Sequence, residues 1–114
     1  MVSRQTLLIV DDNESNIIAL KETLEGNIDA EIFTATSGNE AVQKAFEQDF
    51  DLFMMDVKMP DMDGFEAVKY IKKEAKNKLI PVLFLTGVSA EPADIIKGLE
   101  SGAAVDYIIK PIFQ

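Results

Sequence analysis

Hydrophobic residues along the chain gather in short continuous runs that alternate with amphipathic stretches. Three of these runs predict strands over residues 6–10, 52–55 and 80–85, where nearly every position is apolar. Such a pattern is typical of parallel strands that are buried on both faces. An alternating segment over residues 31–36 predicts an outer strand, and residues 105–109 predict a last strand.

The segments between these strands have the three- to four-residue spacing of amphipathic helices. We predict helices over residues 14–25, 39–48, 63–76 and 92–101. We expect two groups of apolar residues to face the core: Ile17, Ile18, Leu20, Leu24 and Ile28 in the first helix, and Phe65, Val68 and Ile71 in the third. Strands that alternate with helices predict an α/β fold with a parallel sheet covered on both faces.

The length and composition fit one soluble domain. The chain has 114 residues, 47% of them hydrophobic, which is enough to build a core. No apolar run approaches the roughly 20 residues of a membrane span. The apolar run that follows the first five residues is too short for the hydrophobic core of a signal peptide. With no cysteine in the sequence, disulfides and thiol chemistry are excluded, and we expect a cytoplasmic protein.

The end of the chain departs from the usual pattern of such folds. Gln114 follows soon after the fifth predicted strand, so the helix that would normally cover the sheet there is truncated or absent. We therefore expect residues 1–114 to be one domain cut from a longer protein.

Charge and residue types restrict the chemistry. The net charge of −9 argues against direct nucleic-acid binding, which needs a positive surface. The sequence also contains no histidine, so no histidine can act as base, nucleophile or metal ligand. Any chemistry must come from carboxylates, hydroxyls and amines.

Polar residues follow the buried runs at the points where the predicted strands end. These residues are Asp11 and Asp12, Asp56, Thr86 and Lys110. In a parallel sheet the carboxyl ends of the strands share one edge, and ligands bind there. We therefore expect three carboxylates, a hydroxyl and an ammonium group to converge.

The adjacent aspartates predict a cation site. Two carboxylates about 4 Å apart repel by roughly 4 kcal/mol at an effective dielectric near 20, and a bound divalent cation relieves that repulsion. Mg²⁺ is typically held by one or two carboxylates together with phosphate oxygens. Such a site beside Asp56 suits phosphoryl transfer, in which a carboxylate can itself be the nucleophile.

Four sequence blocks, taken together, resemble the receiver domain of two-component response regulators over almost the whole chain. They are VDDNES, MMDVKMPDMDGFE, LTG and DYIIKP. The resemblance implies a flavodoxin-like (βα)5 fold, doubly wound, with a five-stranded parallel sheet in the order 2-1-3-4-5. It also implies a phosphoprotein that acts as a signalling switch in a phosphorelay.

The resemblance implies a role for each carboxylate. Asp56 would be the phosphoacceptor and would carry the aspartyl phosphate. Asp11, Asp12, Asp56 and the backbone carbonyl of Lys58 would bind Mg²⁺, for which Mn²⁺ is an alternative.

The resemblance also implies a switch at the end of the fourth and fifth strands. Thr86 would hydrogen-bond one phosphoryl oxygen, and Lys110 would pair with another. Tyr107 matches the aromatic residue that moves inward when Thr86 is drawn toward the phosphate. The surface formed by the fourth helix and fifth strand would change on phosphorylation. One output of that change would be formation of a homodimer.

The partners implied by the resemblance are proteins. A histidine kinase or histidine phosphotransfer protein would donate the phosphoryl group, and an output domain or protein would respond. The domain would not be an enzyme in the usual sense, since it would catalyse only its own phosphotransfer and autodephosphorylation.

Simpler interpretations compete at several positions. One simpler interpretation is that Asp12, Asn13 and Ser15 are only loop and helix-cap residues. Two adjacent aspartates after one buried strand, and Asp56 at the end of another, favour the cation site instead. Asp61 and Asp63 precede Gly64 as in a calcium loop, but the other ligands of that motif are absent. We interpret them as turn and cap residues.

Three other functions compete with a receiver domain. A phosphatase with an aspartyl nucleophile requires a second carboxylate two residues after it, where this chain has Lys58. A flavodoxin-like flavin site requires hydroxyls and amides after the first strand, where DDNES would repel the phosphate. A receiver-like scaffold that binds partners without phosphorylation is the closest alternative, and a phosphorylation assay distinguishes it.

Overall fold

The computed structural model describes residues 4–86 and 104–109, with side chains as far as residue 85. The predicted helix over residues 92–101 and the candidate site residue Lys110 therefore lie outside the described residues. None of the described helices has the length and hydrophobicity of a transmembrane segment.

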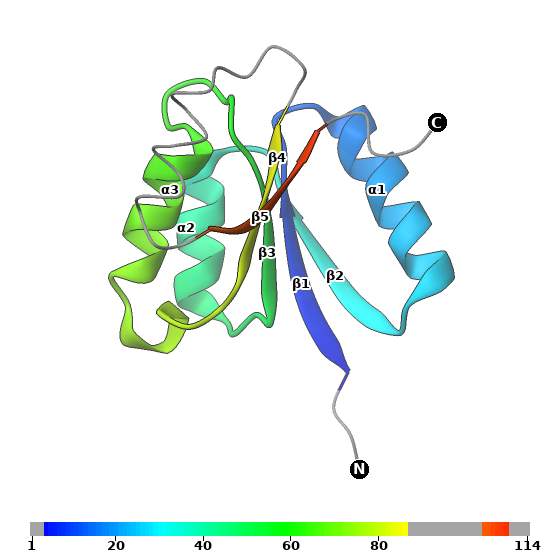
Figure 1. Cartoon of the computed structure of the whole chain (residues 1–114), viewed down its shortest axis with the longest axis horizontal. Helices are drawn as coiled ribbons and strands as arrows, with labels where there is room; N and C mark the ends of the chain where they lie inside the picture. The colour runs from blue at the N-terminus through cyan, green and yellow to red at the C-terminus, as the bar shows by residue number, and fades with distance from the viewer. Residues whose placement is uncertain (1–3, 87–103, 110–114) are drawn as a thin grey trace.

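The chain alternates strands and helices around one parallel sheet (Figure 1). In chain order the elements are β1 (Gln5–Val10), α1 (Glu14–Asn27), β2 (Ala30–Ala35), α2 (Gly38–Glu47), β3 (Leu52–Asp56), α3 (Gly64–Lys72), the 3₁₀ helix η1 (Ala75–Asn77), β4 (Val82–Thr86) and β5 (Ala104–Ile109). The strand order is β2-β1-β3-β4-β5, and all pairs are parallel. The predicted fold class and strand order are confirmed.

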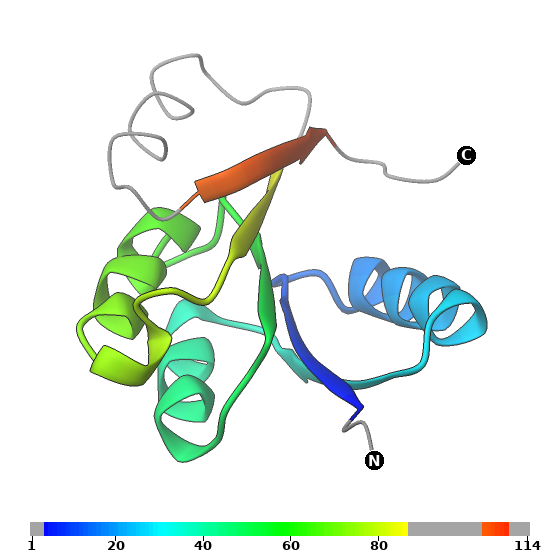
Figure 2. The ribbon, with the colours of Figure 1, turned by 60° about the horizontal axis from the view of Figure 1, so that its bottom comes forward.

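Helices cover both faces of the sheet. Figure 2 shows α1 on one side and α2 with α3 on the other. The alternation along β1 explains how one strand serves both layers: Leu7 and Ile9 belong to the cluster under α1, whereas Leu8 and Val10 belong to the cluster under α2 and α3. All four side chains are at most 5% exposed, as expected for a strand buried on both faces.

The first helix buries fewer residues than its apolar spacing predicts. Ile17 and Leu20 are buried, whereas Ile18 is 56% and Ile28 is 45% exposed. The prediction that these two isoleucines face the core is wrong. Ile18 lies one position past Ile17 and therefore points about 100° away from the buried stripe, and Ile28 is the extended C-cap residue beyond the helix.

The third helix is shorter at both ends than the predicted span of residues 63–76. Asp63 is its N-cap and accepts a hydrogen bond from the Glu66 backbone N–H at 2.8 Å. The helix ends at Lys72, and a separate turn, η1, follows. In that turn the buried side chain of Asn77 donates to the Ala45 carbonyl at 3.4 Å, which ties the segment to α2.

The amine of Lys72 holds the chain after α3 against the start of β4. It donates to the carbonyls of Lys78 and Ile80. Burial lowers the pKa of this amine. These contacts require residues 73–81 to turn back toward the sheet, so the amphipathic pattern could not continue as one helix.

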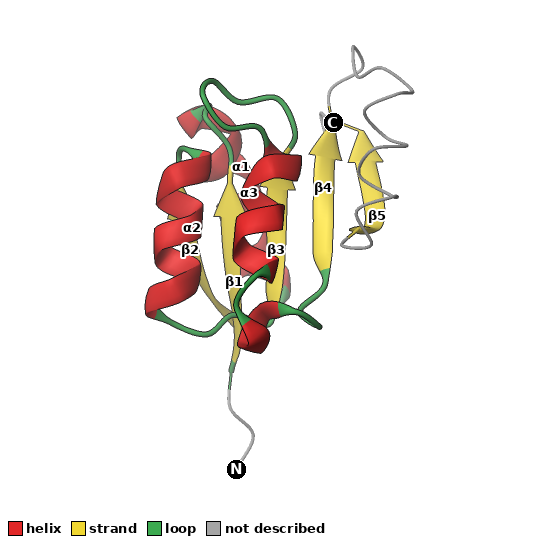
Figure 3. Ribbon diagram, turned by 90° about the vertical axis from the view of Figure 1, so that its left-hand side faces the viewer, coloured by secondary structure: helices red, strands yellow, loops and turns green. Residues whose placement is uncertain are grey.

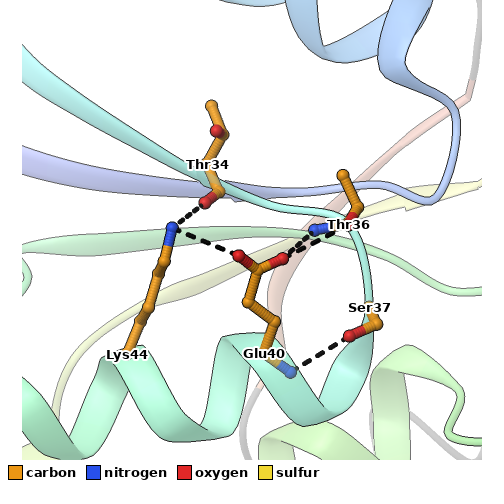
Figure 4. Close-up of polar contacts among 5 residues, drawn as sticks. All are labelled: Thr34, Thr36, Ser37, Glu40 and Lys44. Atoms are coloured by element: carbon orange, nitrogen blue, oxygen red, sulfur yellow. Dashed lines mark hydrogen bonds and ion pairs between the residues drawn. The ribbon is translucent and has the colours of Figure 1, made fainter.

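A carboxylate network joins the start of α2 to the end of β2 (Figure 4). Ser37 caps α2 by accepting from the Glu40 backbone N–H at 3.1 Å. The Glu40 side chain reaches back and accepts from the Thr36 backbone N–H at 2.7 Å, and it lies 3.4 Å from the Lys44 amine. This is a capping box shifted by one residue. The Thr36 hydrogen bond, together with the charge of Lys44, lowers the pKa of the Glu40 carboxyl from 4.5.

Gly64 has no room for a side chain, whereas Gly26 has room for one. A Cβ on Gly64 would lie 2.2 Å from the Asp56 carbonyl oxygen, whereas a Cβ on Gly26 in α1 would have nothing within 4 Å. The Gly64 backbone N–H also donates to the Val57 carbonyl at 2.9 Å. The start of α3 therefore packs directly on the end of β3, and only a glycine permits this approach.

We expect Glu40→Ala to lower the free energy of unfolding by roughly 1 kcal/mol near pH 7, the usual cost of a lost helix cap. The folded pKa of Glu40 lies below 4.5, so this contribution is complete above about pH 4.5 and is lost as the pH falls through the folded pKa. Urea unfolding followed by circular dichroism at several pH values measures the effect. Glu47→Ala, in the last turn of the same helix, is the control and should show no comparable loss.

We expect Gly64→Ala to destabilise the fold by roughly 3 kcal/mol, because the clash is with backbone that cannot rotate away. Gly26→Ala should stabilise it by roughly 0.5–1 kcal/mol, since alanine favours a helix. Thermal unfolding of both variants gives the comparison. Equal stability of the two would contradict the close approach of α3 to β3.

Candidate functional site

Three carboxylates lie together at the carboxyl ends of β1 and β3. Figure 3 shows that the strands point the same way, so that these ends share one edge of the sheet. Asp11 and Asp12 follow β1, and Asp56 is the last residue of β3. Each offers one carboxylate oxygen, and these oxygens all lie within 4.8 Å of one another. The structure thus brings together the three acids that we expected to converge.

The three carboxylates differ in their exposure. Asp11 is 1% and Asp56 is 3% exposed, whereas Asp12 is exposed. Two charges at the end of a hydrophobic sheet are costly unless they are compensated. The cluster therefore has two anions held by the protein and one that faces solvent, which leaves an approach for a ligand.

Hydrogen bonds from the start of α1 hold Asp11 in place. Its backbone N–H donates to the Ala35 carbonyl at 3.1 Å, which continues the pairing of β1 with β2. One carboxylate oxygen, Oδ1, accepts from the Asn13 backbone N–H at 2.9 Å. The other, Oδ2, accepts from Nδ2 of the Asn16 side chain at 3.3 Å.

Asn16 is a residue that our sequence reasoning missed at this site. Asn13 caps α1 by accepting from the backbone N–H groups of Ser15 and Asn16, which agrees with the cap interpretation. An amide side chain five residues after Asp11, inside the first helical turn, is the signal that could have identified Asn16.

The chain around Asp56 is fixed by the sheet and by α3. Asp56 lies opposite Leu85 of β4, and the next backbone N–H, of Val57, donates to the Leu85 carbonyl at 3.1 Å. Gly64 closes the other side by its contact with the Asp56 carbonyl. Lys58 is exposed in the loop that follows, two residues after Asp56. These contacts place the Asp56 backbone on a rigid element.

The remaining predicted residues belong to β4, β5 and the segment after it. Thr86 is the last residue of β4, directly after Leu85, and therefore ends at the same edge as Asp56. Tyr107 lies in β5, which pairs with β4. Their side chains and the whole of Lys110 lie outside the described part, so their roles stay predictions.

The two acids after β3 that resemble a calcium loop have structural roles. Asp63 caps α3, and Asp61 adopts a positive φ of 69° in the turn before it, a conformation that aspartate tolerates better than most residues. The interpretation of both residues as turn and cap residues is confirmed.

The donor set suits a hard divalent cation. Carboxylate oxygens are the ligands of Mg²⁺ and Mn²⁺, whereas zinc sites usually include nitrogen or sulfur donors. The chain contains no histidine and no cysteine. At an effective dielectric near 20, each close pair of these carboxylates repels by roughly 4 kcal/mol. A cation bound among Asp11, Asp12 and Asp56 would therefore relieve the repulsion and counter negative charge on an incoming phosphoryl group.

Comparisons with known proteins agree on the family. The model of the response regulator receiver domain matches residues 7–114. A probable cyclic di-GMP phosphodiesterase of Vibrio cholerae is 40% identical over 111 residues, which is 97% of this chain and 24% of the relative. The response regulator PleD of Caulobacter vibrioides is 38% identical over 106 residues, or 93% of this chain and 23% of PleD. The chain thus spans about a quarter of these relatives.

Solved structures have the same fold. The chemotaxis protein CheY4 of Vibrio cholerae matches with a TM-score of 0.88 and 34% identity, covering 98% of this chain and 90% of that protein. The receiver domain of a sensor histidine kinase from Pseudomonas aeruginosa, which has a magnesium ion coordinated in its active-site cleft, matches with a TM-score of 0.84 and 28% identity, covering 98% of this chain and 88% of that one. The chain belongs to the response regulator receiver domain family and is a phosphoacceptor switch of two-component signal transduction.

Proposed function

We propose that Asp56 is the phosphoacceptor of this switch and that Asp11 and Asp12 hold the Mg²⁺ that the transfer requires. The observation that supports the proposal is the clustering of their carboxylate oxygens within 4.8 Å at the carboxyl edge of the sheet. A phosphohistidine on a histidine kinase or histidine phosphotransfer protein is the donor.

The reaction is an in-line transfer between nitrogen and oxygen. A carboxylate oxygen of Asp56 bonds to phosphorus while the bond between phosphorus and the imidazole nitrogen breaks, and the electron pair of that bond goes to the nitrogen. Asp11, Asp12, Asp56 and the Lys58 carbonyl would hold the cation. The bound Mg²⁺ supplies charge neutralisation for the transferred group, which is the main requirement of phosphoryl transfer.

The other predicted residues complete the switch. Thr86, at the end of β4, donates its hydroxyl to one phosphoryl oxygen, and Lys110 pairs with another. Tyr107 on β5 moves inward as Thr86 shifts, so that the surface near β5 changes. The domain catalyses only its own phosphotransfer and autodephosphorylation, and the family points to the cytoplasm as its location.

The output remains part of the proposal. The two curated relatives described above are about four times as long as this chain, and the phosphorylated surface would act on an output domain or protein, or through a homodimer. No direct nucleic-acid contact by this domain is proposed, because its net charge is −9.

The first test is phosphorylation of the purified chain. We expect acetyl phosphate with Mg²⁺ to add one phosphoryl group, measured by intact-protein mass spectrometry, and we expect Asp56→Asn to abolish this gain because an amide is not a nucleophile. Asp61→Asn is the control, since asparagine tolerates the positive φ at that position. An unmodified native chain that is folded and binds Mg²⁺ would instead support a scaffold that works without phosphorylation.

The second test concerns the cation. Removal of one carboxylate charge in Asp12→Asn should weaken Mg²⁺ binding at least tenfold, because nearby charges contribute several kcal/mol at this range. Titration calorimetry gives the dissociation constant, and the Mg²⁺ concentration for half-maximal phosphorylation should rise in parallel. Asp61→Asn again serves as the control. An unchanged constant in Asp12→Asn would contradict the role of Asp12 as a ligand.

A further inference from the structure

Asn16, in the first turn of α1, donates a hydrogen bond from its side-chain amide to Asp11. We propose that Asn16 is a positioning residue that fixes the plane of the Asp11 carboxylate and thereby raises the affinity of the site for Mg²⁺. The proposal rests on the magnesium site described above and adds a residue to it that is not itself a ligand.

Each carboxylate oxygen of Asp11 accepts a hydrogen bond from a residue at the start of α1. The Asn13 backbone N–H donates to Oδ1 at 2.9 Å, and Asn16 Nδ2 donates to Oδ2 at 3.3 Å. The terminal torsion of an aspartate is broad, so hydrogen bonds to both oxygens restrict it more than a bond to one of them. Two bonds, one on each oxygen, define its plane.

The arrangement at the start of α1 differs from an ordinary capping box. In that motif the third residue of the helix reaches back to the N-cap backbone N–H. Here Asn13 is the N-cap and Asn16 is the third residue, but the Asn13 N–H bonds to Asp11 instead. The Asn16 amide therefore serves the aspartate and not the cap.

Asparagine at position 16 suits the binding of Asp11 better than it suits the stability of the helix. Asparagine is a poorer helix former than alanine, glutamate or glutamine. A glutamate or aspartate at position 16 would stabilise the helix through its dipole. It would, however, add a fourth negative charge beside the three carboxylates. An amide supplies a donor to Asp11 without adding charge.

A positioning role and a merely structural role predict different results for Asn16→Ala. We expect the Mg²⁺ dissociation constant to rise roughly tenfold, the lower end of the range for residues that orient metal ligands. We expect the midpoint of urea unfolding to stay the same or rise, because alanine favours the helix. The rate of phosphorylation by acetyl phosphate should approach that of the native chain at saturating Mg²⁺.

Titration calorimetry on the 114-residue chain measures the constant, and electron paramagnetic resonance of Mn²⁺ gives a second value. Ser15→Ala is the matched control, because Ser15 contributes its backbone N–H to the cap and alanine keeps that group. The Mg²⁺ affinity of this variant should stay within about twofold of the native value, a change much smaller than the tenfold effect expected for Asn16→Ala. Asn16→Leu, nearly isosteric but without a donor, should behave as Asn16→Ala does.

The outcomes separate this inference from the proposed function. A native affinity in both folded Asn16 variants, with Mg²⁺-dependent phosphorylation of the native chain intact, would overturn the role of Asn16 alone. A native chain that binds no Mg²⁺ would overturn the magnesium site and the role of Asn16 with it. An equal loss of affinity in Ser15→Ala would show a general effect of the first helical turn and would also overturn the role of Asn16.

Discussion

The register between β1 and β3 is the constraint on which the site depends. Val10 lies opposite Met55, so the residues that follow them, Asp11 and Asp56, emerge side by side. A slip of one residue would turn every side chain of β3 to the other face of the sheet. The slip would move Phe53 from the cluster under α2 and α3 to the face covered by α1, so the packing of the hydrophobic core holds the two carboxylates in register.

Hydrogen bonds beyond the strand ends extend this rigidity into the loops. The Asp11 N–H bonds to Ala35, the Val57 N–H bonds to Leu85, and the Gly64 N–H bonds back to Val57. Each bond is made by the backbone, so it does not depend on the identity of the side chain. The acids therefore project from fixed backbone positions, although Asp11 and Asp12 lie in the loop after β1. Rigid support of this kind is what a metal site needs for defined geometry.

Some of this architecture could be predicted from sequence because it depends on local patterns. Continuous apolar runs such as Leu7–Val10 identify parallel strands buried on both faces. Acids directly after two such runs must lie at the same edge of the sheet, where the carboxyl ends of the strands meet. The exposed Ile18 could not be predicted, since spacing alone does not fix which way a helix is rotated about its axis. The end of α3 at Lys72 depends on a contact with Ile80, and the bond of Asn16 to Asp11 depends on how α1 begins. Both are set by tertiary structure.

The carboxylate cluster also has a packed connection toward β5. Gly64 touches the Asp56 backbone, and the neighbouring Phe65 packs its ring 4.8 Å from that of Phe84 in β4. Phe84 in turn lies opposite Tyr107 in the sheet. Contiguity alone does not establish coupling, which requires an element with two states that the site biases. Because β3 and α3 are held by backbone bonds and close packing, the proposed function assigns that element to the β4–β5 side of the sheet. Under that proposal, a carboxylate fixed at the end of β3 would let a change of charge alter the surface near β5 while the fold stays intact.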